Sequence, residues 1–154
     1  MKLKGKSLKN DLTDYAVYPR LDGDLVFKIT PVSDWSTFNE LCPTPKPKTK
    51  TLADNKKEAY LEDKEYLKAV DNNNALRNAY LFINSLKETD GLEWEKVKLG
   101  EPDTWLSYLD ELNELSTPEL NDLFDRVLVV NSLSDNHIEK ARARFLATLQ
   151  TESK

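Results

Sequence analysis

Near the N-terminus, hydrophobic and polar residues alternate in the pattern of a β-strand. The pattern runs through residues 25–30 (LVFKIT), which are also rich in β-branched and aromatic side chains. The Asp22–Gly23 pair before it is a turn signal, and Pro31 after it ends the strand because proline has no N–H to donate. We therefore predict a β-hairpin. Since a lone hairpin is only marginally stable, one face must pack on other apolar residues, namely Leu25, Phe27 and Ile29.

Residues 33–41 (SDWSTFNEL) have the spacing of a short helix. Ser33 or Asp34 would cap it, and one face would carry Trp35, Phe38 and Leu41. Proline then occupies every second position in residues 43–47, which excludes helix and makes sheet unexpected. We call residues 43–50 the strap and predict that it is a polyproline II segment reaching to about Lys50.

Residues 55–88 contain neither glycine nor proline and keep a stripe of apolar residues, so we predict a long helix there. The stripe is interrupted at residues 71–74 (DNNN), and asparagine is unfavourable inside helices. Either one rod or a helical hairpin would satisfy this pattern, and we favour two packed halves. A connector with a short extended piece follows.

The C-terminal third shows three further helical patterns. The first follows a cap at Asp103 or Thr104; the second is capped by Thr117, with Pro118 at the first helical position. The third is capped by Ser134 and should face inward with Ile138, Ala141, Phe145 and Leu149. Together they predict a C-terminal helical bundle. The predicted fold is mostly α (α+β), with residues 1–50 holding the hairpin, short helix and strap, and residues 51–154 forming a helical domain.

Charge is distributed unevenly along the 154 residues. Residues 1–58 hold 11 Lys/Arg against 8 Asp/Glu, a net of +3, whereas residues 59–154 hold 11 against 19, a net of −8. An acidic body argues against nucleic acid as a partner, because phosphate contacts need a concentrated positive face. No apolar run approaches the roughly 18 residues of a membrane span, and no signal-peptide pattern follows the first lysines. We expect a soluble cytoplasmic protein with no membrane partner.

The sequence contains few residues suited to catalysis or metal binding. Cys42 and His137 are its only cysteine and histidine, so neither a zinc site nor a cysteine–histidine pair is expected. A cysteine at a helix end also faces the negative end of the dipole, which disfavours the thiolate. Carboxylates are numerous, and solvated faces account for them. We predict no enzyme activity, no catalytic residue, no metal and no cofactor.

Aromatic residues and the strap are better candidates for protein binding. Tryptophan and tyrosine concentrate binding energy at interfaces, and a preformed extended chain loses little entropy on docking. The strap lacks the interleaved aromatic residues that single-stranded nucleic acid would need for stacking. The residues proposed to bind a partner are Trp35, Phe38, Pro43, Pro45, Trp94 and Trp105.

The order of these segments resembles a known family. The strand, helix and proline run in FKITPVSDWSTFNELCPTPKP carry one half of the resemblance. The other half lies in LEWEKVKLGEPDTWLSYLDEL and in LSTPELNDLFDRVLVVNSLSDNHIEKARARFLA. Together they look like the tail assembly chaperones of long-tailed (siphovirus-type) bacteriophages and prophages, and they cover just under half of the chain.

This resemblance implies a non-enzymatic protein of the host cytoplasm. Such a chaperone would bind the long, aggregation-prone tape measure protein and recruit tail tube subunits to it; some members are also made in a longer, frameshifted form. Self-association stays open. One alternative is a structural virion subunit, a tail or capsid accessory protein. Another is a helix-turn-helix regulator reading DNA with Arg142 and Arg144, against which the acidity of that half speaks.

Overall fold

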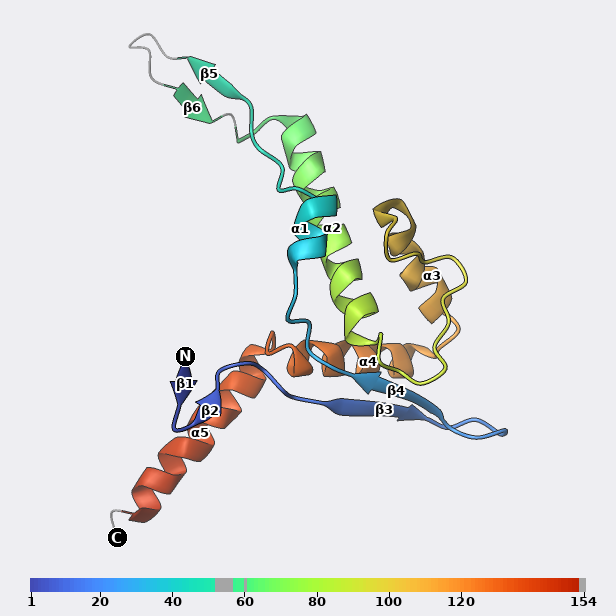
Figure 1. Cartoon of the computed structure of the whole chain (residues 1–154), viewed down its shortest axis with the longest axis vertical. Helices are drawn as coiled ribbons and strands as arrows, with labels where there is room; N and C mark the ends of the chain where they lie inside the picture. The colour runs from blue at the N-terminus through green and yellow to red at the C-terminus, as the bar shows by residue number, and fades with distance from the viewer. Residues whose placement is uncertain (52–56, 60, 153–154) are drawn as a thin grey trace. The chain divides into compact units, whose positions relative to one another are not determined.

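The computed structural model describes residues 1–51, 57–59 and 61–152. Helices dominate and an N-terminal β-hairpin is present, which confirms the predicted mostly α (α+β) class (Figure 1). The strands are β1 (Lys2–Leu3), β2 (Lys6–Ser7), β3 (Asp14–Tyr18), β4 (Leu25–Ile29), β5 (Thr49–Thr51) and β6 (Lys57–Ala59). The helices are α1 (Ser36–Leu41), α2 (Lys64–Ser85), the 3₁₀ helix η1 (Pro102–Ser107), α3 (Tyr108–Leu112), α4 (Thr117–Val130) and α5 (Asp135–Glu152).

The chain forms two compact units, each built from segments that are distant in the sequence. Unit 1 comprises Met1–Ser33, Ser85–Leu92 and Leu115–Lys154, and unit 2 comprises Asp34–Asn84 and Glu93–Glu114. This division differs from the predicted boundary between residues 50 and 51. Of the three C-terminal helical segments, η1 with α3 belongs to unit 2, whereas α4 and α5 belong to unit 1.

In unit 1, the predicted hairpin is confirmed and lies on α4. Strands β3 and β4 are antiparallel, with Ala16 opposite Phe27 and Tyr18 opposite Leu25. The face bearing Ala16, Tyr18 and Ile29 is buried, and α4 contacts both strands. Helix α4 contributes Leu123, Val127 and Val130 to this core. The apolar face that the hairpin needed for stability is therefore supplied by a helix about 90 residues later in the chain.

Helix α4 begins with a capping box, one residue earlier than predicted. Ser116, rather than Thr117, is the N-cap: the Glu119 backbone N–H donates to Ser116 Oγ at 3.3 Å, and the Ser116 N–H donates to Glu119 Oε1 at 3.0 Å. Thr117 is the first helical residue and Pro118 the second. The reciprocal bonds satisfy two backbone donors that a cap at Thr117 would have left open.

The prediction that α5 faces inward is wrong. Ile138, Ala141, Phe145 and Leu149 are all exposed, and so is every residue from 138 to 151. The amphipathic pattern is real, but no segment of the described chain covers it.

In unit 2, α2 is one continuous helix through residues 71–74, so the favoured division into two packed halves is wrong. Asn73 stays in the helix and donates its side-chain N–H to the Cys42 carbonyl at 3.2 Å, so its polar side chain is used in a tertiary contact. The helix also begins at Lys64 rather than near 55. Residues 57–59 form β6, and the rest of the predicted helical start, residues 55–56 and 60, lies outside the described residues.

Three local predictions in unit 2 need adjustment. The strap is irregular only to Lys48, because Thr49–Thr51 form β5 and pair with β6. Helix α1 begins at Ser36, where the Asp34 carboxylate accepts a hydrogen bond from the Ser36 N–H. The region after Glu101 starts as a 3₁₀ helix, so Thr104 lies inside it; its hydroxyl donates to the carbonyls of Lys98 and Glu101.

Candidate interaction surfaces

An aromatic cluster forms the centre of unit 2. The rings of Trp35, Phe38, Tyr80 and Trp105 lie 5.1–6.3 Å apart between centroids. Phe38 is 2% exposed and Trp105 is fully buried, with its Nε1–H donating to the Lys98 carbonyl at 3.1 Å. Both were candidates for partner binding, and both instead pack α1 and η1 on α2. Their side chains are therefore part of the core of unit 2.

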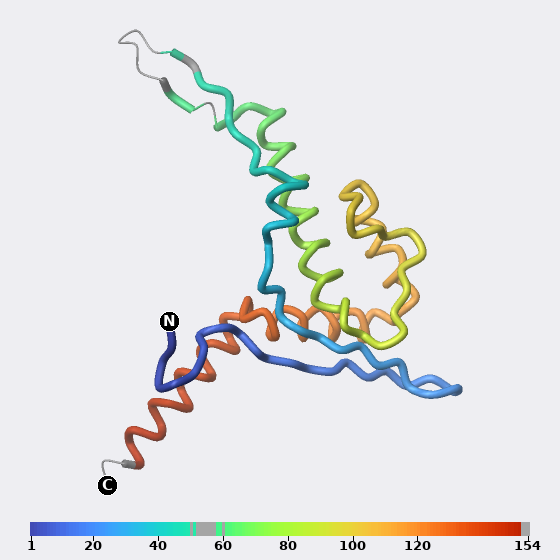
Figure 2. The backbone as a smooth tube through the Cα atoms, viewed as in Figure 1, coloured from blue at the N-terminus to red at the C-terminus, as the bar shows by residue number. Residues whose placement is uncertain are grey.

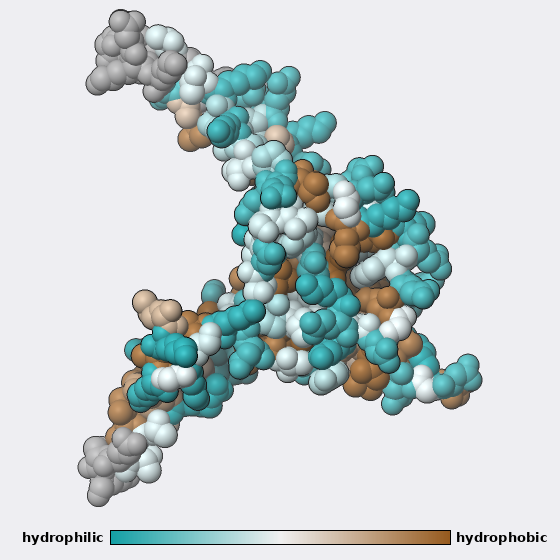
Figure 3. All heavy atoms as spheres, in the orientation of Figure 1, coloured by the Kyte–Doolittle hydropathy of each residue, from teal (hydrophilic) through white to brown (hydrophobic). Residues whose placement is uncertain are grey.

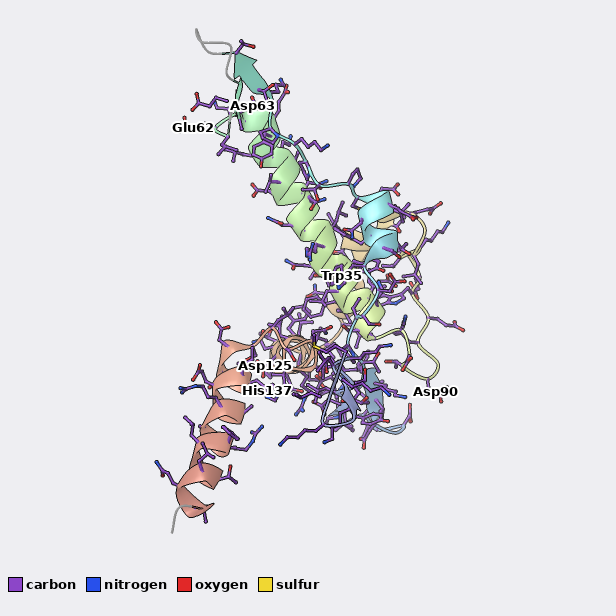
Figure 4. All side chains as sticks on the ribbon, turned by 60° about the vertical axis from the view of Figure 1, so that its left-hand side comes forward. Trp35, Glu62, Asp63, Asp90, Asp125 and His137 are labelled. Atoms are coloured by element: carbon purple, nitrogen blue, oxygen red, sulfur yellow. The ribbon has the colours of Figure 1, made fainter. Side chains whose placement is uncertain are left out.

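Trp35, at the start of α1, is only half-buried (Figure 4). The Arg77 guanidinium lies 4.7 Å from the centre of its ring, a cation–π contact on the surface of the cluster. Among the other candidates, Trp94 and Pro45 are half-buried and Pro43 is exposed. These four residues are accessible, and their role in binding a partner stays a prediction.

The strap runs beside α2 (Figure 2). Two side-chain contacts hold it there. Asn73 donates to the carbonyl of Cys42, immediately before the strap, and Lys48 Nζ lies 3.1 Å from Glu65 Oε2. Both members of that ion pair are largely exposed, at 69% and 81% for their side chains, so its strength is small. Lys46, between these points, is exposed.

Cys42 and His137 lie on different elements, at the end of α1 and in the first turn of α5. Cys42 is buried at the end of α1, and burial raises the pKa of its thiol, which disfavours the reactive thiolate. His137 is half-exposed in the first turn of α5 (Figure 4). In the described part of the chain, no three His, Cys, Asp or Glu residues are grouped so that they could hold a metal ion. No helix there is long and apolar enough to cross a membrane.

A network of charged side chains joins the hairpin of unit 1 to α4. Arg20 donates to both carboxylate oxygens of Glu119, at 2.8 and 3.0 Å, and these bonds lower the pKa of Glu119 from 4.5 to about 2. Arg126 lies between Asp122 at 2.9 Å and Asp14 at 3.0 Å. Tyr18 donates its hydroxyl proton to Asp122 at 3.0 Å; its burial and this bond both raise its pKa. These contacts hold the hairpin against α4.

An exposed row of apolar side chains lies on α5. Four large side chains recur at helical spacing, and Figure 3 shows hydrophobic residues along this helix. Their exposed fractions are 49% for Ile138, 61% for Phe145, 39% for Leu146 and 46% for Leu149. The helix has 18 residues and a length of about 27 Å. We call these four residues and Ala141 the α5 face. Sequence reasoning recognised the face but assigned it to the core, because a pattern does not say what covers it.

Comparisons of the chain with models of known protein families, with curated proteins and with solved structures find no match. Function is therefore argued from the surfaces described above.

Proposed function

We propose that this chain is a tail assembly chaperone of a long-tailed bacteriophage or prophage. It would bind the tape measure protein and recruit tail tube subunits without catalysing a reaction. The proposal starts from the resemblance of FKITPVSDWSTFNELCPTPKP and of the C-terminal helices to such chaperones. It requires a surface that can hold an apolar helical partner.

The observation that carries the proposal is the uncovered α5 face. Most helix stability in proteins comes from packing an amphipathic face rather than from helix propensity. A helix of 18 residues that leaves Ile138, Phe145 and Leu149 in solvent gains little from its own chain. A partner that covered this face would stabilise the helix and bury its apolar side chains at once.

The partner implied by the resemblance has matching chemistry. A tape measure protein is a long helix with an exposed apolar stripe, and two such stripes bind by placing side chains at i, i+3, i+4 and i+7 against each other. Here the i, i+3, i+7 and i+11 positions are Ile138, Ala141, Phe145 and Leu149. A contact of about five turns per chaperone is small, so many copies would bind one long helix and could be removed as the tube assembles.

The test is co-expression with a helical segment of the tape measure protein that is insoluble alone. We expect the wild-type chain to keep that segment in the supernatant and to co-purify with it. Phe145→Asp with Leu149→Asp places two carboxylates on the α5 face, and this variant should lose both effects.

The matched control places two carboxylates on the opposite side of the same helix, as Ala143→Asp with Ala147→Asp. Both alanines are exposed, and the same charge is added. Equal solubilisation by the two variants would show that the α5 face is not the binding surface, and the proposal would lose its main support.

A structural virion subunit is the alternative, since it would use exposed surfaces for permanent contacts. Mass spectrometry of purified virions separates the two functions. A chaperone should be absent from finished particles, whereas a stoichiometric amount of this chain would identify it as a structural subunit.

A further inference from the structure

Unit 1 contains an open groove of about 690 Å³ beside the hairpin. One wall is the face of the β3–β4 sheet that does not contact α4, with Tyr15 and Val26 exposed there. The other wall is the loop after α2, which includes Glu88, Asp90 and Leu92. Figure 4 shows Asp90 in this loop. The groove is therefore lined by both apolar and charged side chains.

The outer edge of β4 opens into this groove at Val26. Thr89 Oγ1 accepts from the Lys28 N–H at 2.9 Å and donates to the Lys28 carbonyl at 3.1 Å, and the Thr30 N–H donates to the Ser85 carbonyl. These bonds show that the backbone groups of Lys28 point away from β3. By the alternation of an antiparallel ladder, those of Val26 do so too. Within the described residues no other hydrogen bond occupies them, so an extended segment can pair there.

The charges around the groove indicate which kind of extended segment could bind in it. Asp24, Glu88 and Asp90 contribute three carboxylates to its lining, whereas Lys28 is the one lysine there and lies 3.8 Å from Glu88. The lining is net acidic. A matching segment must be extended, carry lysine or arginine, and have backbone groups free on at least one edge.

The strap has these properties. Pro43, Pro45 and Pro47 have no N–H, so one edge of the extended strap lacks donors. Paired as a β-strand, the strap would carry the backbone groups of Thr44, Lys46 and Lys48 on the other edge, because residues two apart point the same way in a strand. Lys46 and Lys48 are exposed, and the Lys48–Glu65 contact is a surface ion pair that is readily exchanged.

We propose that the groove of one copy binds the strap of a second copy. The Thr44–Lys48 edge pairs with Val26, and Lys46 and Lys48 lie among Asp24, Glu88 and Asp90. Groove and strap are different surfaces, so the contact is heterologous and links copies head to tail. This inference is independent of the proposed function, because it concerns self-association without a partner protein.

The experiment measures the mass of the full chain by sedimentation velocity at increasing protein concentration and low ionic strength. We expect the average mass to rise above the 17.7 kDa of one copy and to fall back when salt is added. The strap variant Lys46→Glu with Lys48→Glu, and the groove variant Asp24→Lys with Asp90→Lys, should each remain monomeric. All four positions are exposed, and circular dichroism would verify that each variant folds.

An equimolar mixture of the strap variant and the groove variant tests directly whether strap and groove bind each other. The acidic strap of one then faces the basic groove of the other, and the reverse pairing is wild-type, so self-association should return in the mixture alone. The control variant Lys68→Glu with Lys96→Glu changes two exposed lysines outside both surfaces and should associate like the wild type.

Three results would overturn the inference. The wild-type chain could stay monomeric at every concentration, or the mixture could fail to associate. Association that survives both charge variants but is lost in Phe145→Asp with Leu149→Asp would assign the contact to the α5 face instead. The first two results do not bear on binding of a tape measure segment. The third concerns the α5 face itself, and co-expression with the tape measure segment then tests the proposed function separately.

Discussion

Helices α4 and α5 follow each other in the chain and differ in what covers them. Both have apolar residues at helical spacing. In α4, Leu123 and Val127 are fully buried against the hairpin, whereas in α5 Ile138 and Phe145 are 49% and 61% exposed. The stronger apolar stripe of α4 therefore forms a core helix, whereas the weaker stripe of the more polar α5 stays an open surface.

The difference shows that helical periodicity predicts which residues form an apolar face. It does not predict which part of this chain, or of another protein, packs on that face. Helix α4 meets a two-stranded sheet that needs an apolar support, and its position is set by the capping box and by the contacts of Arg20 and Arg126. Helix α5 has no such complement among the described residues of its own chain. Its face is available to another protein, and the following predictions separate these two conditions.

The largest effect is expected at Leu123 in α4. Leu123→Ala removes buried methyl groups and leaves a cavity beneath the hairpin, so the free energy of unfolding should fall by about 2–5 kcal/mol. Urea unfolding followed by circular dichroism measures this change. A loss well under 1 kcal/mol would mean that α4 is not packed as described.

A moderate effect is expected at the capping box. Ser116→Ala leaves the Glu119 N–H without its side-chain acceptor and should cost about 1 kcal/mol of stability. Thr117→Ala at the neighbouring position is the control, since the structure makes Ser116 the cap. If the threonine variant lost as much as the serine variant, the assignment of the cap would be incorrect.

Glu119 should make unit 1 sensitive to acid. Its pKa is lowered in the folded chain from 4.5 to about 2. The contribution of its carboxylate to the free energy of unfolding is therefore complete above about pH 5 and is lost as the pH falls toward 2. Glu119→Gln imitates the protonated acid. The stability difference between wild type and this variant should therefore be largest near neutral pH and disappear near pH 2.

Urea unfolding across this pH range measures that difference. Arg20→Ala removes the principal cause of the lowered pKa of Glu119. In that background, the stability difference caused by Glu119→Gln should therefore depend much less on pH. A difference that stayed constant from pH 7 to pH 2 would contradict the ion pair with Arg20.

The smallest effect on stability is expected in α5. Phe145→Ala removes a side chain that is 61% exposed, so the free energy of unfolding should change by no more than about 0.5 kcal/mol. Amide hydrogen exchange should also be faster in α5 than in α4, because few buried contacts protect it. A loss comparable with that of Leu123→Ala would show that the face is covered within the chain, and the contrast between the helices would vanish.

Part of the architecture follows from local residues. The alternation in residues 25–30, the Asp22–Gly23 turn and Pro31 predicted the hairpin that is observed, and the helical periodicity of 117–130 predicted α4. Two local expectations failed because tertiary contacts overrode propensity. Asn73 keeps α2 continuous by donating to the Cys42 carbonyl, and Thr49–Thr51 pair with β6 instead of extending the strap.

The surface candidates were harder to predict. Trp35, Pro43, Pro45 and Trp94 are accessible, whereas Phe38 and Trp105 are core residues. An aromatic residue suits both a core and an interface, and only the neighbours that the fold brings to it decide between them. The groove beside β4 was not recognised, because its walls come from residues about 60 positions apart.

By itself, the sequence determined the class of the fold, the hairpin, the presence of amphipathic helices and the basic, proline-spaced strap, because each depends on residues close together in the chain. The tertiary structure alone decided that α4 covers the hairpin, that the aromatic rings form a core and that α5 stays open. These outcomes depend on which apolar faces pack together. Because the hydrophobic effect is non-directional, an apolar face can be buried by any complementary surface, within the chain or on another protein.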